Sequence, residues 1–380
     1  MNEILDLHKK GKIEITSKVK INNKKDLSLA YTPGVAQISN LIAKDKNLAY
    51  RYTSKQNLIA IVTDGSAVLG LGNIGPEAAL PVMEGKSILF KKFANVDAFP
   101  ICLNTQDQDK IVEIIKSISP VFAAINLEDI SSPRCFYIEK KLKQDLDIPV
   151  FHDDQHGTAI VVLAALFNAL KVVKKKINEV KIIINGAGAA GIATTRLLLN
   201  YTDNIIVCDR SGTIYKNRKE NMDFAKEEIS YLTNKNNIKG TLNDALKQAD
   251  VFIGVSTGNI LNENSIKLMN KDSIVFALAN PIPEIMPDIA KKAGAKIIAT
   301  GRSDFPNQVN NALAFPGVFR GLLDIRAKYI DDKMKKQAAI ALSSIIKKPS
   351  PTNIIPSVFD KRIVPAISKA IKETYKELPL

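Results

Sequence analysis

The chain lacks tryptophan and has few cysteines and histidines among its 380 residues. Its three cysteines, Cys102, Cys135 and Cys208, are odd in number, lie far apart and form no C-x-x-C pair. Disulfide frameworks and thiolate zinc sites need paired or closely spaced cysteines, so the sequence excludes both. We therefore expect a reducing, cytoplasmic environment.

Long apolar runs are missing as well. Residues 158–170 form the longest uncharged apolar stretch, which is shorter than the roughly 20 residues of a membrane-spanning helix. We interpret this stretch as a buried helix and expect no membrane partner. The first 20 residues are charged throughout, so we predict no secretory or transit segment.

The charge is strongly positive, with 53 Lys and Arg against 39 Asp and Glu and a net charge of +14. Clustered cations would indicate a nucleic-acid partner. Here the lysines are scattered, and short runs such as 174–176 contain no interleaved aromatic residues. We interpret them as solvated surface rather than a binding patch and expect no nucleic-acid partner.

The hydrophobic pattern predicts an α/β fold in two domains. A chain of this length exceeds what one core usually organises. Short apolar runs that read as buried strands alternate with amphipathic runs, which indicates parallel sheets covered by helices. The predicted strands are Leu58–Val62, Phe99–Leu103, Val121–Ile125, Lys181–Ile184, Ile205–Cys208, Val251–Gly254, Ile274–Ala277 and Ile297–Ala299. Predicted helices include Asp109–Ser117, Arg134–Gln144, Ala189–Leu199 and Leu242–Gln248.

A domain boundary is expected in a polar loop near residues 153–158, which gives domains of 1–153 and 154–380. The last fifty residues read as helices that could pack on either domain. A helical segment at Ile4–Lys20 is a candidate interface for a homodimer or a larger homo-oligomer.

A dinucleotide-binding motif, IIINGAGAAG, spans residues 182–191 and places G-x-G-x-x-G between a predicted strand and a predicted helix. Gly186 suits the tight turn, Gly188 allows close approach of a pyrophosphate, and Gly191 allows helix and strand to pack closely. We expect the phosphates to bind along the motif, which also includes Ala187, Ala189 and Ala190. The motif predicts a doubly wound, Rossmann-type second domain.

The end of the next predicted strand carries two residues that indicate which dinucleotide binds, NAD or NADP. Asp209 follows the glycine motif by about 20 residues, the distance at which an acid binds the ribose hydroxyls of NAD. Arg210 follows it and could instead accept the 2′-phosphate of NADP. NAD is the expected cofactor, and NADP stays open.

Three carboxylates, Glu128, Asp129 and Asp154, follow predicted strand ends, where parallel sheets bind ligands. An oxygen-only set suits Mg²⁺ or Mn²⁺, although such residues can also be solvated or cap helices. His152 and His156 flank Asp154 and could suggest zinc. Because no thiolates lie nearby, we expect a structural role for both histidines.

Two further residues are candidates for acid–base chemistry. Lys86 follows a glycine-rich loop at the start of an apolar-rich helix, where a bound cation and burial could lower its pKa toward neutrality. Tyr31 lies in AYTPG, a turn that could hold a phenol at a pocket edge. Taken alone, residues of this kind are more often structural.

Together these segments resemble the malic enzyme family in its short bacterial form, from about Ser28 to Asp324. The matching strings are SLAYTPGVA, VTDGSAVLGLGNIGPEAALPVMEGK, INLEDI, PVFHDDQHGTA, NGAGAAG, ALANPIPEI and TGRSDFPNQVNNALAFPGVFRG. The resemblance implies an N-terminal malic-enzyme domain and oxidative decarboxylation of L-malate to pyruvate with NAD(P) and a divalent metal. A dehydrogenase acting on another substrate and a malolactic activity remain alternatives.

The resemblance also implies residue roles. Lys86 would be the general base, Tyr31 the general acid, and Asp153 the carboxylate that orients Lys86. Glu128, Asp129 and Asp154 would bind the metal, while Asn280, Asn310 and Asn311 would bind malate and the nicotinamide end of the cofactor. One departure stands out, because Ala67 occupies the position of an Arg that binds the substrate carboxylate in larger malic enzymes.

Overall fold

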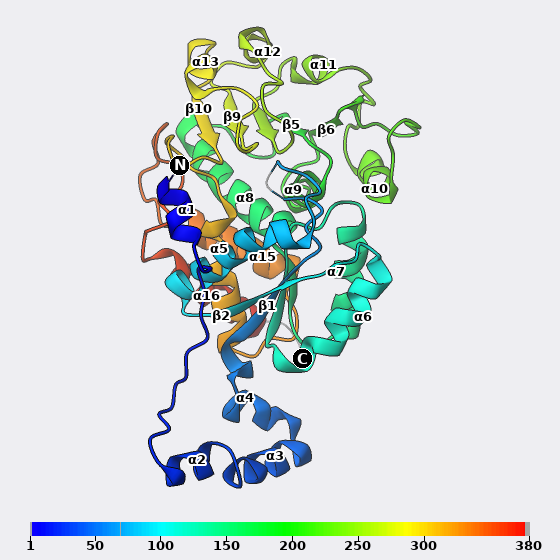
Figure 1. The fold of residues 1–380 in the computed structure, drawn as a ribbon. Helices are drawn as coiled ribbons and strands as arrows, with labels where there is room; N and C mark the ends of the chain where they lie inside the picture. Colours follow the sequence, from blue (N-terminus) through cyan, green and yellow to red (C-terminus); the bar gives the residue numbers. More distant parts are fainter. Residues whose placement is uncertain (1, 69, 377–380) are drawn as a thin grey trace.

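The computed structural model describes residues 2–68 and 70–376, which contain two separate β-sheets (Figure 1). The first sheet has the order β2-β1-β3-β4, and all of its strands are parallel. Its strands are β1 (Leu58–Thr63), β2 (Asp97–Cys102), β3 (Ala124–Leu127) and β4 (Val150–His152). The helices α5 (Pro76–Ala94), α6 (Gln108–Ile118) and α7 (Arg134–Asp145) connect them.

The second sheet has the order β10-β9-β8-β5-β6-β7 and is parallel except for β7. Its strands are β5 (Ile182–Asn185), β6 (Ile205–Asp209), β7 (Gly212–Thr213), β8 (Val251–Gly254), β9 (Ile274–Ala277) and β10 (Ile297–Thr300). The intervening helices are α9 (Ala189–Leu198), α10 (Phe224–Leu232), α11 (Leu242–Leu246), α12 (Glu263–Lys267) and α13 (Pro287–Lys292). The chain direction across the sheet reverses between β5 and β8, which is where such sheets bind ligands. The predicted α/β class and Rossmann-type second sheet are confirmed.

Helix α8 (Asp153–Val173) joins the two sheets. It is long and apolar enough to span a membrane, but 67% of its most apolar window is buried inside the protein, as in a core helix. The polar loop predicted at 153–158 is wrong, because His152 caps α8 and the helix begins at Asp153, directly after β4. The domain boundary at 153/154 stays a prediction.

The C-terminal helices pack back on the rest of the protein, as expected. They are α14 (Phe315–Asp324), α15 (Asp332–Ser343) and α16 (Ile363–Lys376). Helix α14 contacts α5 near the first sheet, whereas α15 contacts α8. One hydrophobic core therefore runs from the first sheet through α8 into the second.

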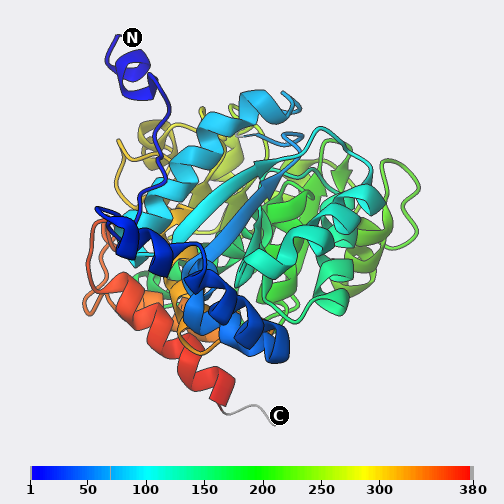
Figure 2. The same ribbon diagram turned by 60° about the horizontal axis from the view of Figure 1, so that its bottom comes forward.

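The N-terminal region projects from this core. Helices α2 (Lys24–Ala30), α3 (Gly34–Lys44) and α4 (Ala49–Tyr52) form an arm, residues 22–52, that extends below the body in Figure 1 and comes forward in Figure 2. None of residues 3–58 is buried. The predicted helix Ile4–Lys20 is wrong beyond α1 (Asn2–His8), because Gly11 has a φ of 79° and β-branched residues follow it.

Two smaller predictions also need correction. The strand predicted at Val121–Ile125 starts at Ala124, because Pro120 favours a 3₁₀ turn at Ser119–Val121. Lys86 lies in the second half of α5 rather than at its start.

Candidate active site

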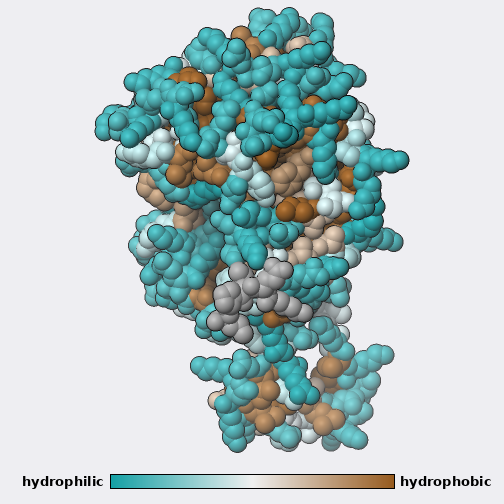
Figure 3. Space-filling model, turned by 180° about the vertical axis from the view of Figure 1, so that it is seen from behind, coloured by the Kyte–Doolittle hydropathy of each residue, from teal (hydrophilic) through white to brown (hydrophobic). Residues whose placement is uncertain are grey.

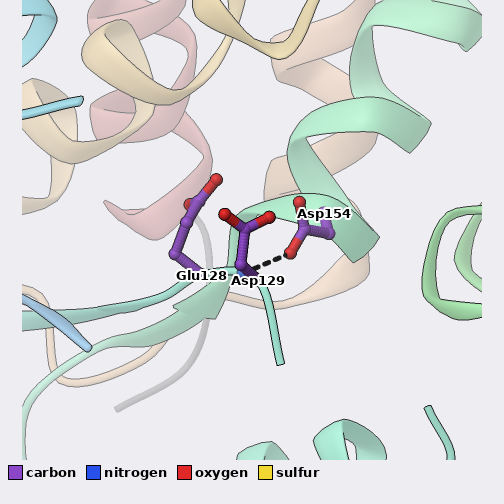
Figure 4. A group of neighbouring side chains, drawn as sticks. All are labelled: Glu128, Asp129 and Asp154. Carbon is purple, nitrogen blue, oxygen red and sulfur yellow. Dashed lines mark hydrogen bonds between the residues drawn. The ribbon is translucent and has the colours of Figure 1, made fainter. Parts of the chain in front are cut away.

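Glu128, Asp129 and Asp154 meet at the carboxyl ends of the adjacent strands β3 and β4, as the sequence predicted. Figure 4 shows the three carboxylates converging, and one oxygen from each lies within 4.8 Å of the others. The backbone N–H of Asp129 donates to Asp154 Oδ2 over 2.8 Å. By contrast, Asp129 Oδ2 is buried and accepts no hydrogen bond from the residues that the structure describes. This oxygen-only cluster therefore has room for a cation.

The electrostatics of the cluster agree with that interpretation. Burial and the charges of Asp154 and Glu128 raise the pKa of Asp129 to about 9. Burial also raises the pKa of Asp154 to about 6. Because like charges disfavour ionisation at such short range, a divalent cation would stabilise the charged form of all three groups.

Lys86 lies beside this cluster, although it comes from helix α5. It is buried, donates to Glu128 Oε1 over 2.6 Å and forms a short hydrogen bond with Asp153. Its Nζ also lies 4.4 Å from the ring centroid of Phe315, which is a cation–π contact. Burial alone would lower the pKa of Lys86, but the carboxylates of Asp153 and Glu128 hold it above its ordinary value.

The histidines near Asp154 have structural contacts. His152 Nδ1 accepts a hydrogen bond from the backbone of Gln155 and so caps α8. His156 Nε2 lies 2.8 Å and 2.9 Å from the two oxygens of Glu139, a buried residue of α7. Glu139 also accepts from the backbone N–H of His152. These contacts fix the start of α8, which carries Asp153 and Asp154.

The dinucleotide motif forms the turn between β5 and α9. Gly186 has a φ of 116°, and a Cβ there would lie 2.6 Å from the carbonyl oxygen of Val255. A Cβ on Gly191 would lie 1.7 Å from the carbonyl oxygen of Gly186. Gly188 faces more open space, since a Cβ there would only approach Ser132 Oγ at 3.7 Å. The tight turn at Gly186 and the close packing at Gly191 agree with the expected geometry, and phosphate binding at this turn stays a prediction.

This turn borders a cavity of about 1190 Å³ at the predicted ligand edge of the sheet. Its walls come from the loops after β5, β6 and β8 and include Gly186, Ala187, Gly188, Asp209, Arg210, Arg218, Lys226, Ser256 and Thr257. An extended dinucleotide needs a site of this size. The cavity therefore has the shape and the phosphate-facing turn that such a cofactor requires.

Asp209 lies in this cavity but is already paired. Arg218 donates to both carboxylate oxygens, at 2.9 Å and 2.5 Å, and Lys226 Nζ lies 3.0 Å from Oδ2. Although burial would raise the pKa of Asp209, these hydrogen bonds hold it below its usual range. Within the described part of the chain, the neighbouring Arg210 forms one hydrogen bond, in which its Nη2 donates to Asn221 Oδ1 over 3.4 Å. Sequence reasoning missed Arg218 and Lys226, because they follow Asp209 by 9 and 17 residues outside any motif.

The three asparagines do not line this cavity. Asn280 is exposed in the loop that follows β9. Asn310 caps a 3₁₀ turn by accepting from the backbone of Ala312, and Asn311 packs at the start of α8, with its Cβ 3.1 Å from a Cβ built on Gly157. Their ligand roles stay predictions.

Tyr31 does not lie at this site within one chain. It ends helix α2 on the arm and is 66% exposed. The expectation of a pocket edge is therefore not met inside a single copy. Lys86, Asp153 and the three metal candidates lie together. Helix α2, which Tyr31 caps, lies on the arm apart from α5 and α8 (Figure 1).

Family models match both parts of the chain. Residues 10–143 match the malic enzyme N-terminal domain, and residues 155–374 match the malic enzyme NAD-binding domain. The chain belongs to the malic enzyme family. The predicted resemblance is thereby confirmed.

Individual relatives agree with this assignment. The bifunctional malic/malolactic enzyme of Bacillus subtilis is 55% identical, and the match covers 99% of this chain and 93% of that protein. The NADP-dependent malic enzyme of Haemophilus influenzae is 45% identical, and this chain spans about half (52%) of its length. The crystal structure of an NAD-dependent malic enzyme from Thermotoga maritima superposes with a TM-score of 0.94 at 49% identity, covering 97% of this chain and 98% of that one.

Proposed function

We propose that the chain oxidises and decarboxylates L-malate to pyruvate and CO₂ while reducing NAD or NADP, and that it needs Mg²⁺ or Mn²⁺. The observation that carries this proposal is the contact of Lys86 with both Asp153 and Glu128 beside the carboxylate cluster. A base, its partner carboxylate and a candidate metal site are thus present within one buried group. Family membership supplies the substrate class.

The residues present fit a divalent metal. Glu128, Asp129 and Asp154 would hold it, since their oxygens converge and no donor among the described residues reaches Asp129 Oδ2. When bound, the metal supplies Lewis-acid stabilisation of the enolate that decarboxylation leaves. Asn126 holds Glu128 in place, because its amide donates to Glu128 Oε2 over 2.9 Å.

Lys86 is the proposed general base. In the structure it is stabilised as an ammonium, and it loses part of that stabilisation when Glu128 and Asp154 are neutralised by a cation. With a cation bound, its pKa would fall, so that it could accept the proton of the malate C2 hydroxyl, while a bound nicotinamide would supply the hydride acceptor. Asp153 and the ring of Phe315 hold the side chain in place throughout.

We call the part of the cavity around Asp209 its ribose end. The charged groups there suit both NAD and NADP. Arg218 and Lys226 already occupy the oxygens of Asp209, so this carboxylate is less free to bind the ribose hydroxyls of NAD than the sequence suggested. Lys226 and Arg210 would offer positive charge to the 2′-phosphate of NADP. We therefore extend the predicted preference for NAD to include NADP.

The general acid is proposed to come from a second copy of the chain. Besides Tyr31, the arm exposes Leu27, Leu29, Val35 and Leu41 by 39–68%, and Figure 3 shows hydrophobic patches on this lobe. Such a surface is unfavourable in water unless a partner covers it. In a symmetric dimer each arm would cover the other copy and bring Tyr31 to its site, where the phenol would protonate C3 of enolpyruvate.

The test is the absorbance change of NAD and of NADP at saturating L-malate, with Mn²⁺ and then with excess EDTA. Reduction that EDTA abolishes, together with one pyruvate formed per cofactor reduced, is the expected result. Lactate without accumulation of reduced cofactor would instead indicate malolactic chemistry. No reduction of either cofactor would refute the proposed function.

A further inference from the structure

A buried carboxylate outside the proposed catalytic centre connects the loops at the ligand edge of the second sheet. Glu284 follows the cis Asn280–Pro281 bond and is 0% exposed. Its Oε1 accepts a hydrogen bond from the backbone N–H of Ser256 over 3.1 Å, and its Oε2 accepts one from that of Ala279 over 3.0 Å. One side chain thus holds the loop after β8 and the loop after β9.

Both loops reach the proposed cofactor site. Ser256 lines the cavity, and its Oγ accepts a hydrogen bond from Asn185, the residue before Gly186, over 2.7 Å. Ala279 directly precedes Asn280, which the resemblance assigns to the nicotinamide end. The ends of β5, β8 and β9 are therefore connected through Glu284.

The sequence makes room for this side chain. A Cβ on Gly254, the last residue of β8, would lie 2.4 Å from Glu284 Cδ and 2.5 Å from its Oε1. The carboxylate therefore lies directly against the end of β8. Burying a carboxylate costs free energy when its described partners are backbone N–H groups rather than cations. This cost indicates that Glu284 has a function at this position.

We propose that Glu284 is a positioning residue for the nicotinamide half of the dinucleotide. It fixes the distance between the loop of Ser256 and the loop of Asn280, so that the cofactor meets a preformed crevice. This inference rests on the proposed function and on the nicotinamide end lying beside Asn280, as the family resemblance implies. It does not depend on which substrate the nicotinamide oxidises.

The test is the substitution Glu284→Gln in the full-length protein, which keeps the shape of the side chain. The amide oxygen can serve one loop N–H, while the NH₂ group faces the other, so one loop loses its hydrogen bond. The Kd for NADH, measured by nicotinamide fluorescence, should rise about tenfold, the size expected for one unsatisfied buried group. Mn²⁺ binding, followed by electron paramagnetic resonance, should stay within about twofold, since neither loop carries a proposed metal ligand.

Asn168→Ala is the matched control. Asn168 is fully buried in α8 and donates to the backbone carbonyls of Ser343 and Ile354, so its loss also removes two buried contacts between segments. It should lower the melting temperature without changing the Kd for NADH. An equal increase of that Kd in both variants would indicate general loosening and overturn the inference, as would an unchanged Kd in Glu284→Gln.

If Glu284→Gln does not fold, hydrogen exchange of the wild-type protein decides. The amides of Ser256 and Ala279 should be protected before NADH is added, because the carboxylate holds them already. Free exchange at both amides would overturn the inference. A wild-type protein that binds NADH but does not oxidise malate would refute the proposed function alone.

Discussion

Lys86 shows how one residue joins three parts of the site. It comes from α5, whereas its partners Glu128 and Asp153 follow β3 and β4, and Phe315 begins α14. Lys86→Ala should lower the turnover of malate by about 10²–10⁴, the usual contribution of a positioned general base. Steady-state rates check this, with the Kd for NADH as the control that should not change. Retention of wild-type turnover would remove Lys86 from the mechanism.

The carboxylates predict a pH dependence of metal binding. The pKa of Asp154 is raised to about 6 and that of Asp129 to about 9, so protons compete with the metal below these values. Raised carboxyl pKa values also mean that the metal-free protein loses stability as the pH rises from the unfolded value toward the folded one. Mn²⁺ should therefore bind more tightly and raise the melting temperature more at pH 8 than at pH 6. Titration calorimetry and thermal unfolding at both pH values measure this, and equal effects at both would contradict the assigned ligands.

Lys226 carries a prediction about cofactor choice. Because its ammonium lies at the ribose end of the cavity, Lys226→Ala should raise the KM for NADP about tenfold and change the KM for NAD much less. Lys219→Ala, which changes an exposed lysine of the loop before α10, is the matched control. An equal change in both KM values would show that Lys226 does not bind the 2′-phosphate of NADP.

At the residue scale the sequence predicted the cluster better than it predicted the ribose site. The metal candidates and Lys86 lie in motifs with fixed spacing to strand ends, so their meeting follows from the topology. The pairing of Asp209 with Arg218 and Lys226 depends on a loop whose path has no sequence pattern. The sequence analysis did not identify Glu284 for a similar reason, because the burial of its side chain depends on Gly254 in a distant strand.

At the scale of elements, buried parallel strands were predicted closely and transitions were not. Apolar runs identify β1, β5, β6, β8, β9 and β10 within about one or two residues, because both faces of a parallel sheet are buried. The polar run at Asp153 looks like a loop, but the same residues favour a helix N-terminus, where acidic side chains interact well with the helix dipole. Local pattern alone does not separate these two outcomes.

The arm is the element that tests the proposed dimer. Leu29→Glu changes a side chain that is 68% exposed in one copy, so an isolated chain should tolerate it within about 0.5 kcal/mol. If the arm covers a second copy, this variant should be monomeric by light scattering and inactive while keeping its unfolding transition. Lys44→Glu, an exposed charge change in α3, should remain dimeric. A Leu29→Glu protein of unchanged size and activity would contradict the proposed interface.

At the scale of the whole molecule, the two sheets are joined through α8 and share one continuous core. Ser132 and Pro133, which follow Glu128 and Asp129 in the chain, line the cofactor cavity. The site of one copy lacks the proposed general acid, because Tyr31 lies on the arm, whereas the proposed base Lys86 lies in the body. The proposed active site therefore combines Lys86 and the metal carboxylates of one chain with Tyr31 of another. Sequence motifs predicted these residues, but no local sequence pattern predicts which copy of the chain contributes each residue to the site.

The most direct measurement of this arrangement mixes two inactive variants, Lys86→Ala and Tyr31→Phe, unfolds and refolds them together, and follows malate-dependent reduction of the cofactor. A mixed dimer contains one site with both native residues, so random pairing should restore about a quarter of wild-type activity. Each variant refolded alone should stay inactive. If the mixture dimerises but remains as inactive as its parts, then Tyr31 does not serve the partner's site, and the composite active site is refuted.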